Sequence, residues 1–273
     1  MAETTTKAAE SLAAVEAALG KLPRTLVIAG SGLGGFAKTL ANSKSLSYAD
    51  IPHFPQSSVV GHAGTLVVGE AGGRRVAVMN GRKHLYEGVP VEVSVHPLRT
   101  LLKGGVRTVI VSNAAGSLNP RFDVGDLVLL SDHINGMFQN PLIGKNDDAA
   151  GPRFPDMSEP YSRRLRQVAR DAAAALGITL REGIYWGGLG PSYETRAEVQ
   201  MLRQFADVVG MSTVPETIAA VHAGAEVLGI SCATNSLVLS AEKTTHDEVI
   251  EVGRAAGERF SALVAEILRR LGD

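Results

Sequence analysis

The sequence has a single cysteine, no long hydrophobic run and almost no net charge. One cysteine, Cys232, excludes both an intramolecular disulfide and a cysteine metal site. No apolar run approaches the roughly 20 residues that span a membrane, and the polar segment 1–10 lacks a signal-peptide core. A net charge of −1 argues against a nucleic-acid surface, which carries a basic excess. These absences favour a cytoplasmic protein that binds neither nucleic acid nor a membrane.

A metal site and a division into several domains are also not indicated. The seven histidines are scattered, and none forms the His-x-x-x-His pair that binds a metal from one helix face, so we expect no metal. With 45% hydrophobic and 20% charged residues, the composition is that of an ordinary globular protein. Because we find no repeat, low-complexity tract or linker, we expect one domain over residues 1–273.

Short apolar runs alternate with segments of helical periodicity along most of the chain. The segments that we expect to be strands are 25–29, 65–69, 75–79, 107–112, 126–131, 182–186, 207–210 and 226–232. The segments that we expect to be helices are 8–19, 91–103, 159–176, 195–205, 214–224 and 247–271. Such alternation predicts an α/β fold, with a mainly parallel, mixed central sheet flanked by helices. The polar stretch 139–153 is expected to be a surface loop.

A glycine-rich turn, Gly30-Ser31-Gly32-Leu33-Gly34-Gly35, follows the first expected strand. A strand, such a turn and a helix together point backbone N–H groups at an anion, and 36–40 can be helical. The glycine spacing also fits a dinucleotide fingerprint, which needs an acidic residue about 20 residues on, after a second strand. The nearest candidate, Asp50, lies in a proline-broken segment. A phosphate turn that carries the Ser31 hydroxyl is the better interpretation, with a purely structural turn as the alternative.

Polar and turn-forming residues follow five of the expected strands. They lie at 81–88, 113–117, 190–195, 211–216 and 233–235. Ligands of such sheets bind at the carboxyl ends of the strands, so this placement predicts one composite site.

The first of these segments contains Arg82-x-His84-x-Tyr86, whose side chains share one face if the chain is extended. Arginine offers a planar fork to two phosphate oxygens, histidine adds a donor, and tyrosine suits a sugar. A solvated edge strand is the alternative. His62, between glycines, is equally compatible with a site residue and with a loop histidine bonded to the backbone.

Tyr193-Glu194 combines an aromatic face with a carboxylate, which suits stacking on a heterocycle and accepting its N–H bonds. Asn235 can read a ring nitrogen and an oxo group together, and Ser212 can offer a hydroxyl to phosphate at a helix start. The alternatives are structural: Glu194 as a helix cap, Asn235 as a turn residue and Ser212 as an N-cap. Likewise, the small residues 113–116 suit either a ligand against the backbone or a close-packed crossover turn.

Seven motifs, in chain order, resemble those of the trimeric class of purine nucleoside phosphorylases. They are Gly30-Ser31-Gly32-Leu33-Gly34, Gly61-His62-Ala63-Gly64, the run from Gly81 to Gly88, Asn113-Ala114-Ala115-Gly116, the run from Gly190 to Thr195, the run from Val209 to Glu216, and Thr234-Asn235. The resemblance implies a homotrimer that catalyses reversible phosphorolysis of inosine and guanosine, or their deoxy forms, to a purine base and (deoxy)ribose 1-phosphate. Inorganic phosphate would be the co-substrate, and no cofactor is implied.

The same resemblance implies roles for individual residues. Phosphate would be held by Ser31, His62, Arg82, His84, the Ala114 amide and Ser212. Ribose would contact Tyr86, Met211, His246 and Phe154, the last from a neighbouring subunit. The base would lie against Ala114, Gly116, Tyr193, Glu194, Val209, Gly210 and Asn235. The residues expected to be catalytic are His62, His84, Glu194 and Asn235.

In this interpretation Glu194 accepts the N1–H of a 6-oxopurine, and adenine, which lacks that proton, is rejected. Lys83 and Ser117 depart from the family pattern, as does the sequence between Asn235 and His246. Three other functions stay open. They are a 5′-methylthioadenosine phosphorylase, which has an aspartate where this chain has Asn235, a non-enzymatic nucleotide- or NAD-binding module, and a nucleoside hydrolase.

Overall fold

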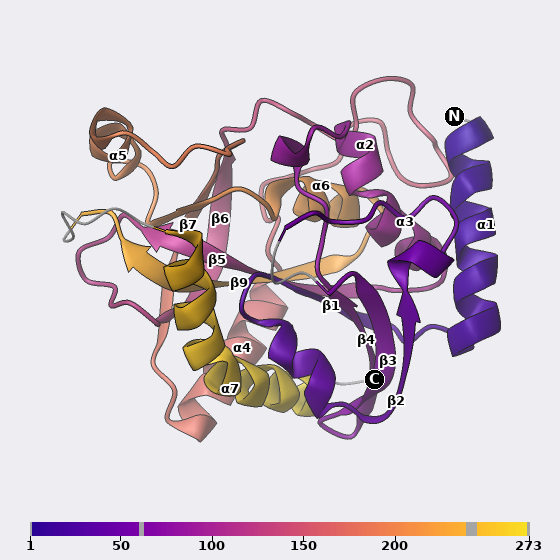
Figure 1. Ribbon diagram of the computed structural model, residues 1–273, viewed down its shortest axis with the longest axis horizontal. Coiled ribbons are helices and arrows are strands. Elements are labelled where there is room, and N and C mark those ends of the chain that lie inside the picture. Colours follow the sequence, from indigo (N-terminus) through magenta and orange to yellow (C-terminus); the bar gives the residue numbers. More distant parts are fainter. Residues whose placement is uncertain (1, 60–62, 239–244, 272–273) are drawn as a thin grey trace.

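The computed structural model describes residues 2–59, 63–238 and 245–271, and within them nine strands form one mixed sheet (Figure 1). The strands are β1 Thr25–Ala29, β2 Ala41–Ser47, β3 Thr65–Ala71, β4 Arg74–Asn80, β5 Thr108–Ser117, β6 Leu127–Asn135, β7 Leu180–Gly187, β8 Val208–Gly210 and β9 Glu226–Ser236. The helices are α1 Ala2–Leu19, α2 Val91–Ser94, α3 His96–Lys103, α4 Arg163–Leu176, α5 Arg196–Leu202, α6 Val214–His222 and α7 His246–Arg270. Short 3₁₀ helices are η1 Gly34–Thr39, η2 Tyr48–Asp50 and η3 Leu85–Glu87.

Strand β5 is the centre of the sheet, which runs in the order β2-β3-β4-β1-β5-β8-β7-β6-β9. Because β9 pairs with both β6 and β5, the last five strands of this order close on themselves, while β2, β3, β4 and β1 extend outward from β5. Five of the nine strand pairings within the described residues are parallel. The expectation of a mainly parallel, mixed sheet is therefore confirmed.

Helices cover both faces of the sheet, as the alternating pattern predicts. Val15 of α1, Leu101 of α3 and Ile218 of α6 belong to one buried cluster. Leu165 of α4 and Phe260 of α7 belong to a second cluster on the opposite face (Figure 1). No helix within the described residues is long and apolar enough to cross a membrane.

Two local expectations are wrong for identifiable reasons. Strand β2 was not expected, because this edge strand of sequence ANSKSLS is mostly exposed and has no apolar alternation. The helix expected over 91–103 is divided into α2 and α3 around Val95. Pro97, in the first turn of α3, has no N–H to continue the preceding helix. The expected loop 139–153 indeed contains neither helix nor strand.

Strands β5 and β9 are longer than the apolar runs that predicted them. They pair in parallel up to Ala115 and Ala233 and, after a register shift, from Gly116 and Asn235 onward. Segments 113–117 and 233–235 are thus strand, so the alternative interpretations of 113–116 and of Asn235 as turns are wrong. The result is that polar residues lie on the ends of two central, paired strands.

Candidate active site

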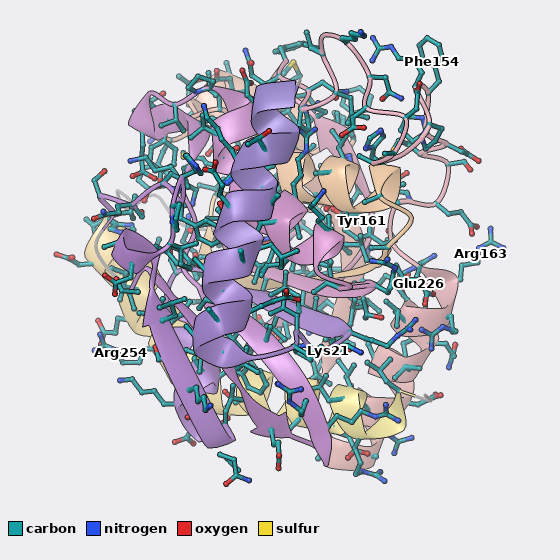
Figure 2. The ribbon with its side chains drawn as sticks, turned by 90° about the vertical axis from the view of Figure 1, so that its right-hand side faces the viewer. Lys21, Phe154, Tyr161, Arg163, Glu226 and Arg254 are labelled. Carbon is teal, nitrogen blue, oxygen red and sulfur yellow. The ribbon has the colours of Figure 1, made fainter. Side chains whose placement is uncertain are left out.

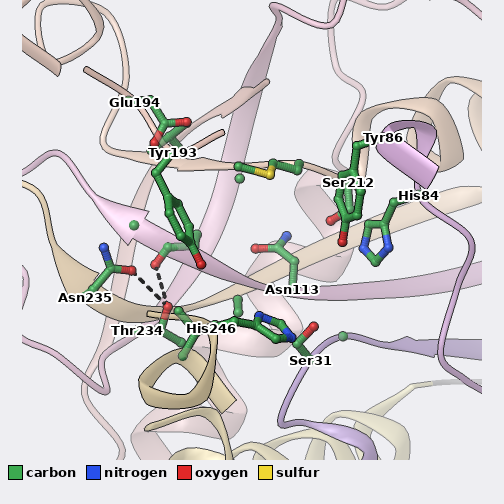
Figure 3. A pocket seen from close by; sticks show the side chains of 18 of the residues that line it. Ser31, His84, Tyr86, Asn113, Tyr193, Glu194, Ser212, Thr234, Asn235 and His246 are labelled. Atoms are coloured by element: carbon green, nitrogen blue, oxygen red, sulfur yellow. Dashed lines mark hydrogen bonds between the residues drawn. The ribbon is translucent and has the colours of Figure 1, made fainter. Parts of the chain in front are cut away.

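A cavity lies at the ends of β1, β5, β8 and β9 and is closed on one side by the start of α7 (Figure 3). Its lining residues are Gly30, Ser31, Arg82, His84, Tyr86, Asn113, Ala114, Ala115, Gly116, Tyr193, Glu194, Val209, Gly210, Met211, Ser212, Thr234, Asn235, Leu237, His246 and Val249. Every described residue that the sequence assigned to a site is among them except Phe154. His62 lies outside the described residues. The predicted segments that follow the strands therefore line one cavity, as the argument from strand ends predicted.

The glycine-rich turn is held against β5 at one end of the cavity. The Leu33 N–H donates to the Gly30 carbonyl over 3.0 Å, and the Gly30 N–H donates to Ser112 Oγ over 3.2 Å. A Cβ on Gly30 would lie 2.6 Å from Asn113 Cα, so this position requires glycine. Asp50 does not line the cavity, which leaves the dinucleotide interpretation without its acidic residue.

Arg82 forms a buried ion pair with Glu216 of α6. Its Nη1 lies 3.2 Å from Glu216 Oε1, and the two side chains are 2% and 10% exposed. Nη2 donates to the Ser112 carbonyl oxygen, and Nη1 lies 3.5 Å from Thr213 Oγ1. The guanidinium is thus fixed and partly neutralised by the protein itself. The sequence alone assigned no role to Glu216, although Glu216 is the last residue of the motif that begins at Val209.

Thr213 links several cavity residues and adopts a strained backbone. It has φ +72°, which is unfavourable for a β-branched residue, and it is fully buried. Asn113 Nδ2 donates to its Oγ1 over 2.8 Å, and Ser212 Oγ lies 3.2 Å from the same atom. Thr213 rather than Ser212 is the N-cap residue of α6, so the simple N-cap interpretation of Ser212 is wrong.

His84 and Tyr86 come together differently from the expectation. The two residues do not alternate along an extended chain, because Tyr86 lies in η3, whose geometry stacks its ring on the His84 ring at 4.7 Å. His84 is buried, which excludes a solvated edge strand. Burial lowers the pKa of His84, so its imidazole is neutral near pH 7.

Glu87 fixes the backbone around His84. It accepts the His84 N–H and the Ser58 N–H, each over 2.7 Å, and pairs with Lys83 Nζ at 2.9 Å. Burial alone would raise the pKa of Glu87, but hydrogen bonds from His84, Ser58 and Lys83 outweigh it and hold the pKa far below the usual range. Lys83, which departs from the family pattern, therefore forms an ion pair with Glu87.

Glu194 does not cap the helix that follows it. Thr195 Oγ1 accepts the Glu198 N–H, and the Glu198 carboxylate accepts the Thr195 N–H over 2.6 Å, which completes a capping box on α5. Glu194 instead lines the cavity, where partial burial raises the pKa of its carboxyl group. The capping interpretation of Glu194 is therefore wrong.

Asn235 lies near the end of β9, and Thr234 orients its side chain. The Thr234 hydroxyl is a donor that lies 3.2 Å from Asn235 Oδ1 and 3.3 Å from the Ala115 carbonyl oxygen, so these two acceptors share its proton (Figure 3). Figure 3 shows Asn235, Tyr193 and Glu194 at one end of the cavity and His84 and Tyr86 at the other.

Some lining residues were not assigned to a site by sequence reasoning. They are Gly30, Asn113, Ala115, Thr234, Leu237 and Val249. Asn113 and Thr234 begin motifs that were selected, and their position at strand ends could have identified them. Asn113 Oδ1 is a buried acceptor without a donor in the described part of the chain.

Comparison with known proteins defines the class. A model of the phosphorylase superfamily matches residues 24–269, so the chain belongs to that superfamily. Within it, the chain belongs to the purine nucleoside phosphorylases, as two relatives show, which confirms the resemblance of the sequence motifs to that family. Purine nucleoside phosphorylase 1 of Geobacillus stearothermophilus is 50% identical over 91% of this chain and 92% of its own. The purine nucleoside phosphorylase of Rattus norvegicus is 46% identical over 91% of this chain and 89% of its own length.

Solved structures give the same answer. A Schistosoma purine nucleoside phosphorylase in complex with hypoxanthine superimposes with a TM-score of 0.93 at 37% identity, covering 98% of each chain. Further structures of the Schistosoma mansoni enzyme contain inosine or adenosine, with TM-scores of 0.92. The α/β nucleoside phosphorylase fold is thereby confirmed.

Proposed function

We propose that this protein catalyses the reversible phosphorolysis of 6-oxopurine nucleosides, with inorganic phosphate as co-substrate and without a cofactor. One observation carries the proposal: a single cavity has anion-binding groups at one end and a carboxylate–amide pair at the other. Ser31, His84 and Ser212 line the first end, and Glu194 and Asn235 line the second (Figure 3). Arg82 also belongs to the first end, because its Nη1 and Ser212 Oγ both contact Thr213 Oγ1. The names of the relatives support the same reaction.

The reaction exchanges one bond at the anomeric carbon. A phosphate oxygen bonds to C1′ while the C1′–N9 bond breaks, and the purine leaves with the bonding electron pair. Donors fixed before phosphate arrives remove orientational cost, and the rigid Arg82 guanidinium is such a donor. Asn235 then donates a hydrogen bond to the purine as negative charge develops on it.

The neutral state of His84 suits the phosphate end. A neutral imidazole still has one N–H to donate, and its pKa is free to rise when an anion binds beside it. Tyr86, Met211 and His246 line the part of the cavity assigned to ribose.

A single assay tests the proposal. Inosine cleavage is followed with and without inorganic phosphate, and ribose 1-phosphate is measured as the product. Cleavage that requires phosphate supports the proposal. Cleavage that does not depend on phosphate favours a hydrolase, preferred turnover of 5′-methylthioadenosine favours that phosphorylase, and NAD binding without cleavage favours a binding module.

The ionisation of Glu194 should limit activity on the acid side. Burial raises the pKa of Glu194 above its ordinary value of 4.5, so the carboxylate that accepts purine N1–H is lost as the pH falls through that raised value. As the pH is lowered, we expect kcat/KM for inosine to begin to decline while the pH is still above 4.5. We expect Glu194→Gln to show no such decline from this group, because its amide does not titrate.

The control is built into the comparison. Protonation of inorganic phosphate and of His84 affects the wild-type protein and Glu194→Gln alike. It therefore cancels in the ratio of their kcat/KM values at each pH. A ratio that stays constant from pH 5 to pH 8 would contradict the role of Glu194.

We also propose that the protein is a homotrimer in which Phe154 completes a neighbouring site. The Phe154 side chain is 86% exposed and lies at the periphery of the chain, with the Arg153 guanidinium 5.4 Å from its ring (Figure 2). Phe138 and Ile143, on the same connection between β6 and α4, are 88% and 76% exposed. Three large apolar side chains exposed on one connection favour an interface between copies at this segment.

Mixed oligomers test Phe154. Phe154→Ala alone should raise KM for inosine about 10- to 100-fold, because burying a phenylalanine contributes roughly 1.5–3 kcal/mol. Co-expression with a Glu194→Ala chain, which has an inactive site but an intact Phe154, should restore a low KM in a fraction of sites. Absence of such complementation, in oligomers shown to be mixed, would contradict a shared site.

A further inference from the structure

Two glycines bring the anion-binding turn and α7 into direct backbone contact. A Cβ on Gly32 would lie 2.7 Å from Gly253 Cα, and one on Gly253 would lie 2.9 Å from the Ser31 carbonyl oxygen and 3.1 Å from Gly32 Cα. Real Cβ atoms essentially never lie within 3.0 Å of a backbone atom. A side chain at either position would therefore force the turn and the helix apart.

The helix itself gives no reason for glycine at position 253. Gly253 lies inside α7, where glycine is less favourable than alanine. Gly32 has φ +77°, so its residue type is already explained by the turn. The close approach explains Gly253, which makes Gly253 the informative member of the pair.

Both partners in this contact carry cavity residues. Ser31 directly precedes Gly32, and α7 begins at His246, whose side chain lines the cavity together with Val249. η1, which follows the turn, also packs on α7 (Figure 1). The contact therefore sets the span between the phosphate end of the cavity and the residues assigned to the sugar.

We infer that Gly253 is a positioning residue for phosphate, which acts by seating α7 against the turn that presents Ser31. This inference rests on the proposed function. Since the contact is between backbones, a displacement of α7 is transmitted to Ser31 without passing through flexible side chains. Filling Gly253 should therefore weaken phosphate binding more than nucleoside binding.

Gly257 provides a matched control one turn further along α7. Its Cβ would lie 3.7 Å from the Gly32 carbonyl oxygen, an ordinary van der Waals distance. Gly253→Ala should raise KM for phosphate about 10- to 100-fold, the range that a displacement near 1 Å can produce, with a much smaller change in KM for inosine. Gly257→Ala should change neither constant.

Hydrogen exchange in the wild-type protein tests the same contact without a variant. Phosphate alone should slow amide exchange at 250–256 of α7, but not at 260–267 near the far end of the helix. If wild-type cleavage requires phosphate and yet Gly253→Ala matches Gly257→Ala, or exchange at 250–256 is unaffected, the positioning role is overturned. Phosphate-independent cleavage by the wild-type protein would instead overturn the proposed function.

Discussion

In Asn235→Asp, kcat/KM for inosine should fall about 10²- to 10³-fold, the usual cost of removing one donor to a developing negative charge. The substitution replaces an amide donor with a carboxylate that only accepts. The same carboxylate can accept a hydrogen bond from the exocyclic amino group of adenosine. Turnover of adenosine should therefore be retained or increase. Because the Thr234 hydroxyl lies 3.2 Å from Oδ1, the new carboxylate should keep the orientation of the amide. Steady-state kinetics with both nucleosides measure this change in selectivity.

Thr234→Val separates the chemistry of Asn235 from its orientation. It removes the hydroxyl that holds the amide but leaves the amide donor in place, so inosine turnover should decline without a gain for adenosine. If Asn235→Asp keeps the wild-type ratio of inosine to adenosine turnover, Asn235 does not read the purine.

The site segments could be predicted because of where strands end. Periodicity located β1, β4, β7 and β8 closely enough to show that glycine, arginine, glutamate and serine motifs follow them. Strands β1 and β4 run parallel to β5, and β8 runs antiparallel to β5 with Val209 opposite Gly116, so residues near the ends of these strands line one cavity. The family motifs then assigned a chemistry to each group.

What could not be predicted depends on long-range packing. The extension of β5 and β9 through polar residues is stabilised by their mutual pairing, which no local pattern reveals. The edge strand β2 has no apolar face to mark it. The strained Thr213 is held by contacts with residues of other motifs, such as Asn113. The stacking of Tyr86 on His84 depends on the 3₁₀ turn η3. Sequence patterns therefore indicated which groups meet, but not how they are held.

Glu216 is the clearest example of a residue whose role only the fold reveals. It lies more than one hundred residues from Arg82 along the chain, yet the two form a nearly fully buried ion pair. Arginine alone suggested a phosphate ligand with a free fork. The structure shows a guanidinium already oriented by Glu216 and the Ser112 carbonyl.

Removing Arg82 should therefore affect stability as well as activity. Arg82→Met leaves the Glu216 carboxylate buried without its partner, which typically destabilises a protein by about 3–5 kcal/mol. KM for phosphate should also rise roughly 10- to 100-fold, because a hydrogen bond to a charged group contributes about 1.5–3 kcal/mol. Urea unfolding gives the first quantity and phosphate titration of inosine cleavage gives the second.

The double variant Arg82→Met/Glu216→Met distinguishes the two effects. Replacing both members of a buried ion pair with apolar side chains of similar length is often neutral or stabilising, so most of the lost free energy of unfolding should return. KM for phosphate should stay as high as in Arg82→Met, because no guanidinium is present to bind the anion. If the double variant is no more stable than Arg82→Met, the destabilisation arises from lost packing. If phosphate KM is unchanged in both variants, Arg82 supports the fold rather than the substrate.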